Sequence, residues 1–221
     1  MSDSMNLHIL IILSLWLGYF ALHSLLASLR LKSWVARHFS RLMPGYRLMF
    51  NGVSVLLLLP ILWLSARWQG EPLWHFSTSL WWLMTILSVL TVIAFFISLR
   101  YYDMDEFIGL KQWREGIDAV EDQEHFVIGD FHRFVRHPWY TMGIILVWSR
   151  ELDPIMLTNA IMITLYFVIG SRFEERKLHR YHGEVYQRYA ELVPALIPRP
   201  WRFLTRQQAR MLLQRNPADS P

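Results

Sequence analysis

Residues 80–99 read LWWLMTILSVLTVIAFFISL and contain no Lys, Arg, Asp or Glu. A helix needs about 20 apolar residues to cross the hydrocarbon core of a bilayer, and this stretch is long enough. Two further uncharged stretches, residues 7–29 and 48–66, meet the same requirement. Trp81 and Trp82 stand where the headgroup boundary is expected. The first half of the chain is therefore predicted to form three membrane-spanning helices.

Two shorter apolar segments follow, residues 138–149 and 155–170, separated by a polar break that contains Glu151, Asp153 and Pro154. Each is short for a complete span. Together they predict a tight helical hairpin. The predicted fold is an all-α integral membrane protein with about five transmembrane helices, the last two forming this hairpin, and a helical cytoplasmic C-terminal segment.

The composition of the 221 residues excludes several classes of protein. Hydrophobic residues make up 53% and charged residues 18%, which rules out a disordered chain. The absence of cysteine rules out disulfides, thiolate metal sites and cysteine nucleophiles. A pI near 9.5 could indicate nucleic-acid binding. The cations lie between the predicted spans, however, which favours loops beside anionic lipid and no nucleic-acid partner.

The distribution of cations predicts the orientation in the membrane. All 22 Lys and Arg residues except Arg67 and Arg150 lie on one side of a five-span arrangement. The positive-inside rule then places the N-terminus outside and the C-terminus in the cytoplasm. No cation precedes Arg30, so the first helix lacks the basic region of a signal peptide and is expected to be retained.

Four regions are expected: a three-helix transmembrane half (1–100), an acidic cytoplasmic loop (101–135), the hairpin with a C-terminal motif (136–200), and a tail (201–221). The acidic loop has no obvious helical stripe in its middle and is either a flap or a solvated connector. The last helix is expected to continue through the polar residues 171–181 to a break at Gly183. A second helix is expected at 184–192 and an amphipathic piece at 207–214.

Candidate chemistry concentrates at the two ends of the hairpin. Arg136-His137-Pro138-Trp139-Tyr140 stands at its mouth, with Pro138 suited to the first position of a helix. The helix N-terminus would favour a carboxylate or phosphate there, although arginine and aromatic residues also serve as plain interfacial anchors. Glu174 and Glu175 follow the hairpin. Adjacent helical side chains point about 100° apart, so one carboxylate is expected to face a site while the other pairs with a cation.

No metal site is predicted. The sequence contains no His–Glu–x–x–His zinc signature. His8 and His75 are the one histidine pair whose expected depth suits haem ligation, but packing is the preferred interpretation of both.

The C-terminal pattern resembles a known superfamily. Arg136-His137-Pro138-x-Tyr140, the hairpin, Glu174-Glu175 and then Gly183-x-x-Tyr186-x-x-Tyr189-x-x-x-Val193-Pro194 are similar to the isoprenylcysteine carboxyl methyltransferase and phospholipid methyltransferase superfamily. Leu22-His23-Ser24, Lys32-x-Trp34 and Gly109-Leu110-Lys111-Gln112 resemble its bacterial methanethiol S-methyltransferase and NnrU-like branch. The sequence departs from the family at Thr141 and Met142, which precede Gly143, and at Leu25-Leu26-Ala27 after the His-Ser pair.

The resemblance implies a multi-pass enzyme of a bacterial inner membrane that transfers methyl from S-adenosylmethionine to a small thiol or lipid-like nucleophile. The C-terminal segment would close over a cofactor pocket that needs no metal. The residues implied in cofactor binding are His137, Tyr140, Gly143, Glu174, Glu175, Tyr186, Tyr189, Val193, Pro194 and Leu196. Arg136 and Glu175 are the implied catalytic residues. Two alternatives stay open: an NADPH-dependent membrane reductase of the sterol-reductase type, and a non-catalytic NnrU-like respiratory assembly factor.

The predicted orientation can be tested with topology reporters. Fusions after residue 45 and after residue 205 should both report the cytoplasm, because the positive-inside rule puts both cationic segments there. A fusion after residue 72 should report the outer side. Reporters placing the first loop and the C-terminal tail on opposite sides of the membrane would contradict the predicted orientation.

Overall fold

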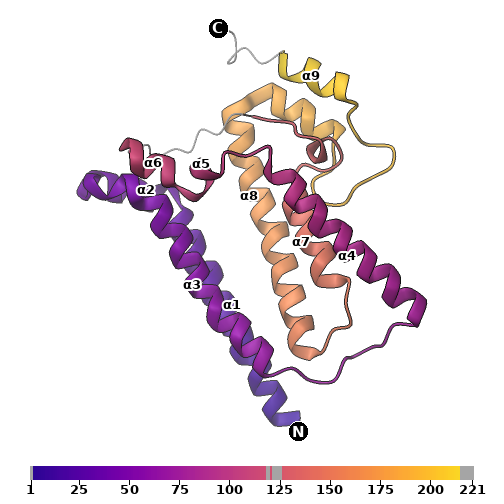
Figure 1. Ribbon diagram of the computed structural model, residues 1–221. Coiled ribbons are helices and arrows are strands. Elements are labelled where there is room, and N and C mark those ends of the chain that lie inside the picture. The colour runs from indigo at the N-terminus through magenta and orange to yellow at the C-terminus, as the bar shows by residue number, and fades with distance from the viewer. Residues whose placement is uncertain (1, 118–119, 121–125, 215–221) are drawn as a thin grey trace. The chain divides into compact units, whose positions relative to one another are not determined.

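The computed structural model describes residues 2–117, 120 and 126–214. Within this part every regular element is helical, and the only strand-like pairing is an isolated bridge between Arg199 and Arg202. The all-α prediction is confirmed. The helices, shown in Figure 1, are α1 (Ser2–Ala27), α2 (Leu29–His38), η1 (Ser40–Gly45), α3 (Tyr46–Arg67), α4 (Thr78–Leu99), α5 (Met104–Ile108), α6 (Leu110–Glu115), η2 (Phe131–Arg133), α7 (Pro138–Trp148), α8 (Pro154–Leu192) and α9 (Arg206–Gln214).

Four helices of the described part are long and apolar enough to cross a membrane: Asp3–Ala27, Ser40–Arg67, Thr78–Leu99 and Pro154–Leu192. In each of these helices, at most 22% of the 18-residue apolar stretch is buried inside the protein. Most of its side chains are therefore available to lipid. The three apolar stretches predicted in residues 1–100 are helical, as expected. Because α7 has only 11 residues, it is shorter than a complete span, and the fifth crossing stays a prediction.

The chain divides into two compact units. The first consists of Met1–His75, Tyr102–Asp122 and Glu151–Met162. Its core includes two buried side-chain hydrogen bonds that share Asn159. Trp16 Nε1 donates to Asn159 Oδ1 (2.7 Å), and Asn159 Nδ2 donates to Ser65 Oγ (2.8 Å). A polar group left unpaired in an apolar environment is costly, so this chain of hydrogen bonds fixes α1, α3 and the start of α8 in register.

The acidic loop is more helical than the sequence predicts. Its first part forms α5 and α6, joined by Gly109 at φ 101°. A Cβ at Gly109 would lie 2.8 Å from Arg47 Cβ, so glycine is required by both backbone conformation and space. Residues 118–119 and 121–125, in the middle of the loop, lie outside the described residues, so the flap and the solvated connector both stay predictions. Four of the acids counted in the loop, Asp118, Glu121, Asp122 and Glu124, lie outside the described residues.

The second unit consists of Phe76–Tyr101, Gln123–Arg150 and Ile163–Pro221. It contains α7 and the part of α8 that follows Met162, and Trp148 Nε1 of α7 donates to Thr164 Oγ1 of α8 at 2.9 Å. Gly143 lies against Phe167, because an added Cβ would come within 2.6 Å of the ring. Trp139 Nε1 donates to Ser98 Oγ at 2.7 Å and ties α7 to α4. Both predicted segments are helical, but the expectation that residues 155–170 are short for a complete span is wrong, because α8 is long and apolar enough to cross a membrane. A tight hairpin of the two helices stays a prediction.

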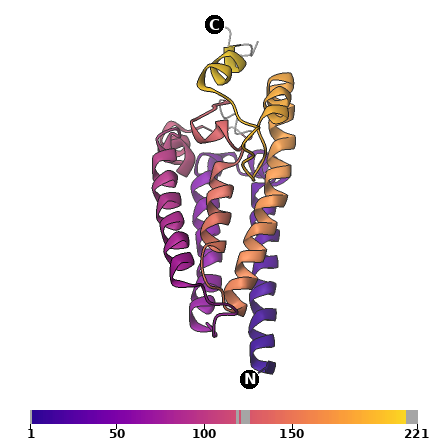
Figure 2. The same ribbon diagram turned by 90° about the vertical axis from the view of Figure 1, so that its right-hand side faces the viewer.

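The C-terminal helices end where the sequence predicts. Helix α8 is interrupted at Gly183, which adopts φ 49° and ψ −128°, and then continues to Leu192. Figure 2 shows the part after the break at the end of α8 remote from Pro154. Helix α9 is the predicted amphipathic piece. A core of Tyr186, Tyr189, Val193, Leu204 and Ala209 joins these segments.

Replacing Gly183 should loosen this C-terminal core. A Cβ there meets nothing within 4 Å, so Gly183→Ala tests backbone conformation alone. We expect a destabilisation of about 1–3 kcal/mol, measured by denaturant unfolding, with faster protease cleavage after residue 183. Gly170→Ala is the matched control, since Gly170 is helical and also has open space. It should be neutral or stabilising by up to about 1 kcal/mol. Equal effects of both changes would contradict the conformational explanation.

Candidate functional site

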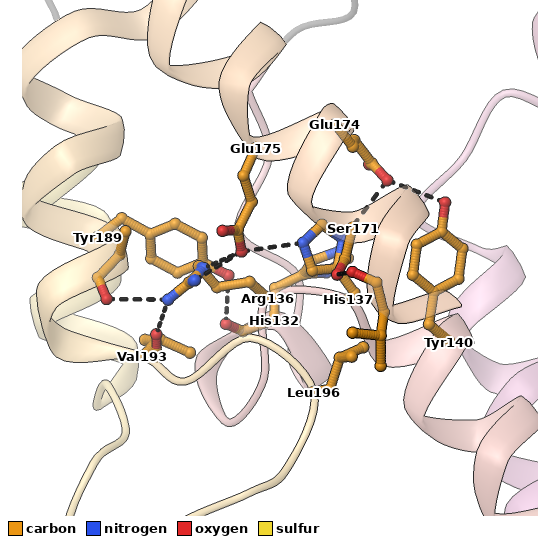
Figure 3. Close-up of polar contacts among 12 residues, drawn as sticks. His132, Arg136, His137, Tyr140, Ser171, Glu174, Glu175, Tyr189, Val193 and Leu196 are labelled. Carbon is orange, nitrogen blue, oxygen red and sulfur yellow. Dashed lines mark hydrogen bonds and ion pairs between the residues drawn. The ribbon is translucent and has the colours of Figure 1, made fainter. Parts of the chain in front are cut away.

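The predicted site residues meet where the N-terminus of α7 faces the polar part of α8, inside the second unit (Figure 3). The chain that follows α8 returns across this point. Residues 193–196 form a short irregular segment here, which we call the strap. Arg136 N donates to Pro194 O (2.9 Å), His137 N donates to Ala195 O (3.1 Å), and Thr141 Oγ1 donates to Leu196 O (2.7 Å).

These bonds change the expected chemistry of the helix N-terminus. The sequence suggests that backbone amides before Pro138 are available to an anion. In the structure the amides of Arg136 and His137 already donate to strap carbonyls. An anionic ligand would therefore depend on side chains rather than on these amides. The strap could not be derived from residue types, because backbone carbonyls carry no sequence signal. Thr141, a polar residue in an apolar helix, is the one signal in the sequence for a hydrogen-bond partner here.

Arg136 joins three segments of the chain. Its Nε and Nη2 donate to Glu175 Oε1 at 2.8 and 2.5 Å, and its Nη1 donates to Ala190 O at 2.9 Å and to Val193 O. The side chain of Arg136 is 11% exposed and that of Glu175 is 19% exposed. A guanidinium has five N–H donors, and protein acceptors in the described part engage most of them. Arg136 thus fixes the strap and Glu175 in one arrangement.

His137 lies between the two glutamates. Its Nε2 is 3.1 Å from Glu175 Oε1 and its Nδ1 is 3.5 Å from Glu174 Oε2, and its side chain is 3% exposed. Burial opposes the charged imidazolium, but hydrogen bonds and charge from Glu174 and Glu175 outweigh it and raise the pKa of His137 above its usual value. The ring stacks on Tyr140 with centroids 5.4 Å apart.

Glu174 and Glu175 differ in exposure, as their positions on the helix predict. Glu174 is 45% exposed and accepts a hydrogen bond from the Tyr140 hydroxyl at 3.0 Å. Glu175 is turned toward Arg136 and His137. The cation that pairs with Glu175 is Arg136, which comes from the loop before α7. Glu174 is consequently the carboxylate that solvent or a ligand reaches.

The remaining predicted residues lie in the layer behind this cluster. Tyr186 and Tyr189 are 1% and 2% exposed and contact Phe126, a residue that the sequence did not single out. The Tyr189 hydroxyl donates to His132 O at 2.6 Å. Burial, followed by the positive charge of His137, lowers the pKa of His132 to about 4. These tyrosines form the floor under the strap rather than an open face.

The histidines considered for haem make other contacts. His8 stacks on Trp68 with centroids 4.1 Å apart, and His75 Nδ1 lies 3.3 Å from Glu151 Oε2. Across residues 2–117, 120 and 126–214, no group of three or more His, Asp or Glu side chains is arranged to hold a metal ion.

Comparison with curated proteins identifies similar chains of one named activity. The sequence is 29% identical to a methanethiol S-methyltransferase of Crocosphaera subtropica over 202 residues, covering 82% of this chain and 72% of that protein. It is also 29% identical to a methanethiol S-methyltransferase of a Pseudomonas species (81% and 69% covered) and to methanethiol S-methyltransferase 1 of Bradyrhizobium diazoefficiens (91% and 70%). These similarities confirm the resemblance to the methanethiol S-methyltransferase branch and support a membrane methyltransferase.

Other comparisons add no relatives. No family model matches the sequence, and no solved structure matches it at a significant level.

The raised pKa of His137 predicts a pH-dependent stability. A group whose pKa is higher in the folded protein stabilises it fully below the unfolded pKa of about 6.5, and that contribution is lost as pH rises through the folded pKa. The free energy of unfolding should therefore fall as pH is raised above about 6.5. His137→Gln should flatten this part of the curve, measured by denaturant unfolding in detergent. His38→Gln, at an exposed position on α2, is the control and should keep the wild-type slope.

Proposed function

We propose that this chain is an integral membrane methyltransferase that uses S-adenosylmethionine and methylates a small thiol or lipid-like nucleophile. A volatile thiol of the methanethiol class is the first candidate acceptor, by analogy with the named activity of its relatives. One observation carries the proposal: Arg136, His137, Tyr140, Glu174 and Glu175 form a single polar cluster at the mouth of an apolar hairpin.

The cluster suits the polar end of the proposed methyl donor. S-adenosylmethionine carries an ammonium group and a sulfonium, and both cations favour a carboxylate that solvent can reach. Glu174 is such a carboxylate. The donor's own carboxylate would compete with Glu174 for the Tyr140 hydroxyl and for the ring of His137. We propose that Glu174, Tyr140 and His137 bind the amino-acid end of the donor.

Arg136 and Glu175 have a different role in this proposal. Their mutual hydrogen bonds and the bonds from Arg136 to the carbonyls of Ala190 and Val193 orient the surrounding groups. Glu175 then acts as a positioning residue, while the charge of Arg136 lowers the pKa of an acceptor thiol held close to it. Tyr186, Tyr189, Val193, Pro194 and Leu196 supply the apolar floor and strap expected beside the adenine. Gly143 leaves room for Phe167 on the adjoining wall.

The proposed reaction is an in-line displacement. When bound, the donor supplies a methyl group on a positively charged sulfur. The acceptor first loses its thiol proton to solvent, and its sulfur then forms a bond to the methyl carbon. The carbon–sulfonium bond breaks and its electron pair stays on the donor sulfur, which leaves uncharged. Since charge is cancelled in this step, apolar walls and fixed geometry favour it, and the protein contributes chiefly alignment.

The unequal exposure of the two glutamates predicts unequal effects on donor binding. Glu174→Gln should weaken S-adenosylmethionine binding at least about tenfold, or about 1.4 kcal/mol, and should lower the free energy of unfolding less than Glu175→Gln does, because Glu174 is the more exposed of the two carboxylates. Glu175→Gln should lower the free energy of unfolding by about 1–3 kcal/mol, because Arg136 loses its charged partner. Calorimetric titration and denaturant unfolding of the purified protein measure these two effects.

Glu184→Gln is the matched control for both measurements, since Glu184 lies on the same helix with an 86% exposed side chain. It should change neither quantity. Small and equal effects at Glu174 and Glu175 would show that the pair is only a solvated helix face.

Methyl transfer itself can be measured with labelled S-adenosylmethionine and a small thiol. We expect transfer without added metal and no inhibition by a chelator, because a thiolate attacks a sulfonium without Lewis-acid assistance. Arg136→Lys keeps the charge but loses the planar fork, so it should retain part of the donor binding and lose most turnover. Arg188→Lys is the control for the same type of substitution and should change neither donor binding nor turnover. Normal turnover in Arg136→Ala would contradict the role of Arg136, and reduction of a substrate with NADPH would contradict the proposed function.

A further inference from the structure

Three large apolar side chains stand out from the C-terminal part of the second unit. Ile197 is 76% exposed, Trp201 is 77% exposed and Phe203 is 47% exposed. Isolated exposed apolar residues are common on proteins, but three within seven residues of one loop indicate a partner for that loop. We call residues 197–203 the tryptophan loop. It lies outside the helices that are long enough to cross the membrane.

The outward position of Trp201 is fixed by the fold. Arg202 N donates to Arg199 O at 3.0 Å, which closes a turn with Pro200 and Trp201 at its centre. Proline is favoured at that position of a turn. Behind the turn, Leu204 is 1% exposed and its N–H donates to Arg133 O at 2.9 Å. The loop is therefore anchored on its inner side while its aromatic tip points away from the protein.

The charged side chains in and around the tryptophan loop are all positive. Between Val193 and Gln214 the sequence contains four arginines and no acidic residue. The guanidinium of Arg202 donates to the carbonyls of Ala190 and Glu191 and so holds the loop from inside. Arg199, Arg206 and Arg210 are exposed. The exposed surface thus combines an apolar tip with cations, which is the composition of segments that lie in the headgroup region of membranes.

The loop also lies at the depth that such a role requires. It follows directly after the strap, whose Leu196 carbonyl accepts from Thr141 in the first turns of α7. Phe203 stacks on Phe134, just before the hairpin mouth, with centroids 5.9 Å apart. The tryptophan loop is therefore level with the end of the apolar hairpin, where tryptophan side chains are favoured at the boundary between lipid and water.

We propose that the tryptophan loop docks on the anionic phospholipid headgroups of the membrane that holds the chain's own helices. Ile197 and Trp201 enter the interface, and Arg199 and Arg210 face the headgroup phosphates. The spans keep the loop beside the bilayer at all times, so a high effective concentration favours docking even where each contact is weak. An acidic protein or a nucleic acid would use the arginines but would leave the apolar tip in water.

The depth of the loop can be measured with a spin label. Because the chain has no cysteine, Ile197→Cys gives a single labelling site in the full-length protein, and the apolar nitroxide replaces a side chain of similar character. Leu90→Cys, 57% exposed on α4, provides the lipid reference, and Glu184→Cys provides the aqueous reference. Accessibility to oxygen and to a soluble nickel chelate is compared in vesicles of phosphatidylcholine with and without phosphatidylglycerol.

With phosphatidylglycerol present, the label at 197 should report a depth between the two references, and it should move toward the aqueous reference in phosphatidylcholine alone. Arg199→Gln combined with Arg210→Gln should reduce the ratio of docked to undocked loop about thirtyfold in the anionic vesicles. Trp201→Ala should also shift the label toward water. Arg188→Gln, an exposed charge elsewhere on α8, is the matched control and should leave the depth unchanged.

Two outcomes would overturn the proposal: a label at 197 that matches the aqueous reference in anionic vesicles, and a depth that does not depend on phosphatidylglycerol. The first result would favour an acidic protein or nucleic acid as the partner of the arginines. The measurement needs no methyl transfer and is independent of the proposed function.

Discussion

The arrangement of the candidate site depends on the bonds that the Arg136 guanidinium makes to one carboxylate and two backbone carbonyls. A buried cation is stable only when its donors are satisfied. The strap and Glu175 satisfy them together, so neither can move away without leaving charge or polar groups unpaired. His137 is held against Glu175 by the same carboxylate oxygen, and through it the position of Glu174 becomes coupled to the strap.

Much of the fold follows from the hydrophobic pattern. Helices in the three long uncharged stretches and in the two later apolar segments, and the break at Gly183, are all found near their predicted positions, because each depends on local features: length, apolar runs and a glycine conformation. The first part of the acidic loop was missed for the opposite reason. Helices α5 and α6 are too short to show a periodic pattern, and they depend on Asp103 as N-cap and on the close approach of Gly109 to α3.

The site was predictable as a set of residues but not as an arrangement. Motif spacing brought Arg136, His137, Tyr140, Glu174 and Glu175 to attention, and the structure places them in one cluster. Which of these residues are engaged by the protein and which remain accessible to a ligand depends on contacts that residue types do not predict. Backbone carbonyls of residues 190 and 193 accept hydrogen bonds from the Arg136 guanidinium, and those of residues 194 and 195 accept from the amides of Arg136 and His137. These donors are therefore engaged within the protein. The tyrosines expected beside a ligand, Tyr186 and Tyr189, are buried under the strap, and their place beside a donor stays a proposal.

Helix α8 carries both lipid-facing residues and the site carboxylates on one continuous rod. Glu174 lies four positions after Gly170, the end of the apolar run, a rise of about 6 Å along the axis. A thicker or thinner bilayer shifts or tilts such a helix to match its apolar length. The depth at which Glu174 meets water is therefore a function of the surrounding lipid chain length. The hydrocarbon thickness of the host membrane thus affects the hydration of the Glu174 carboxylate and, with it, the electrostatics of the cluster.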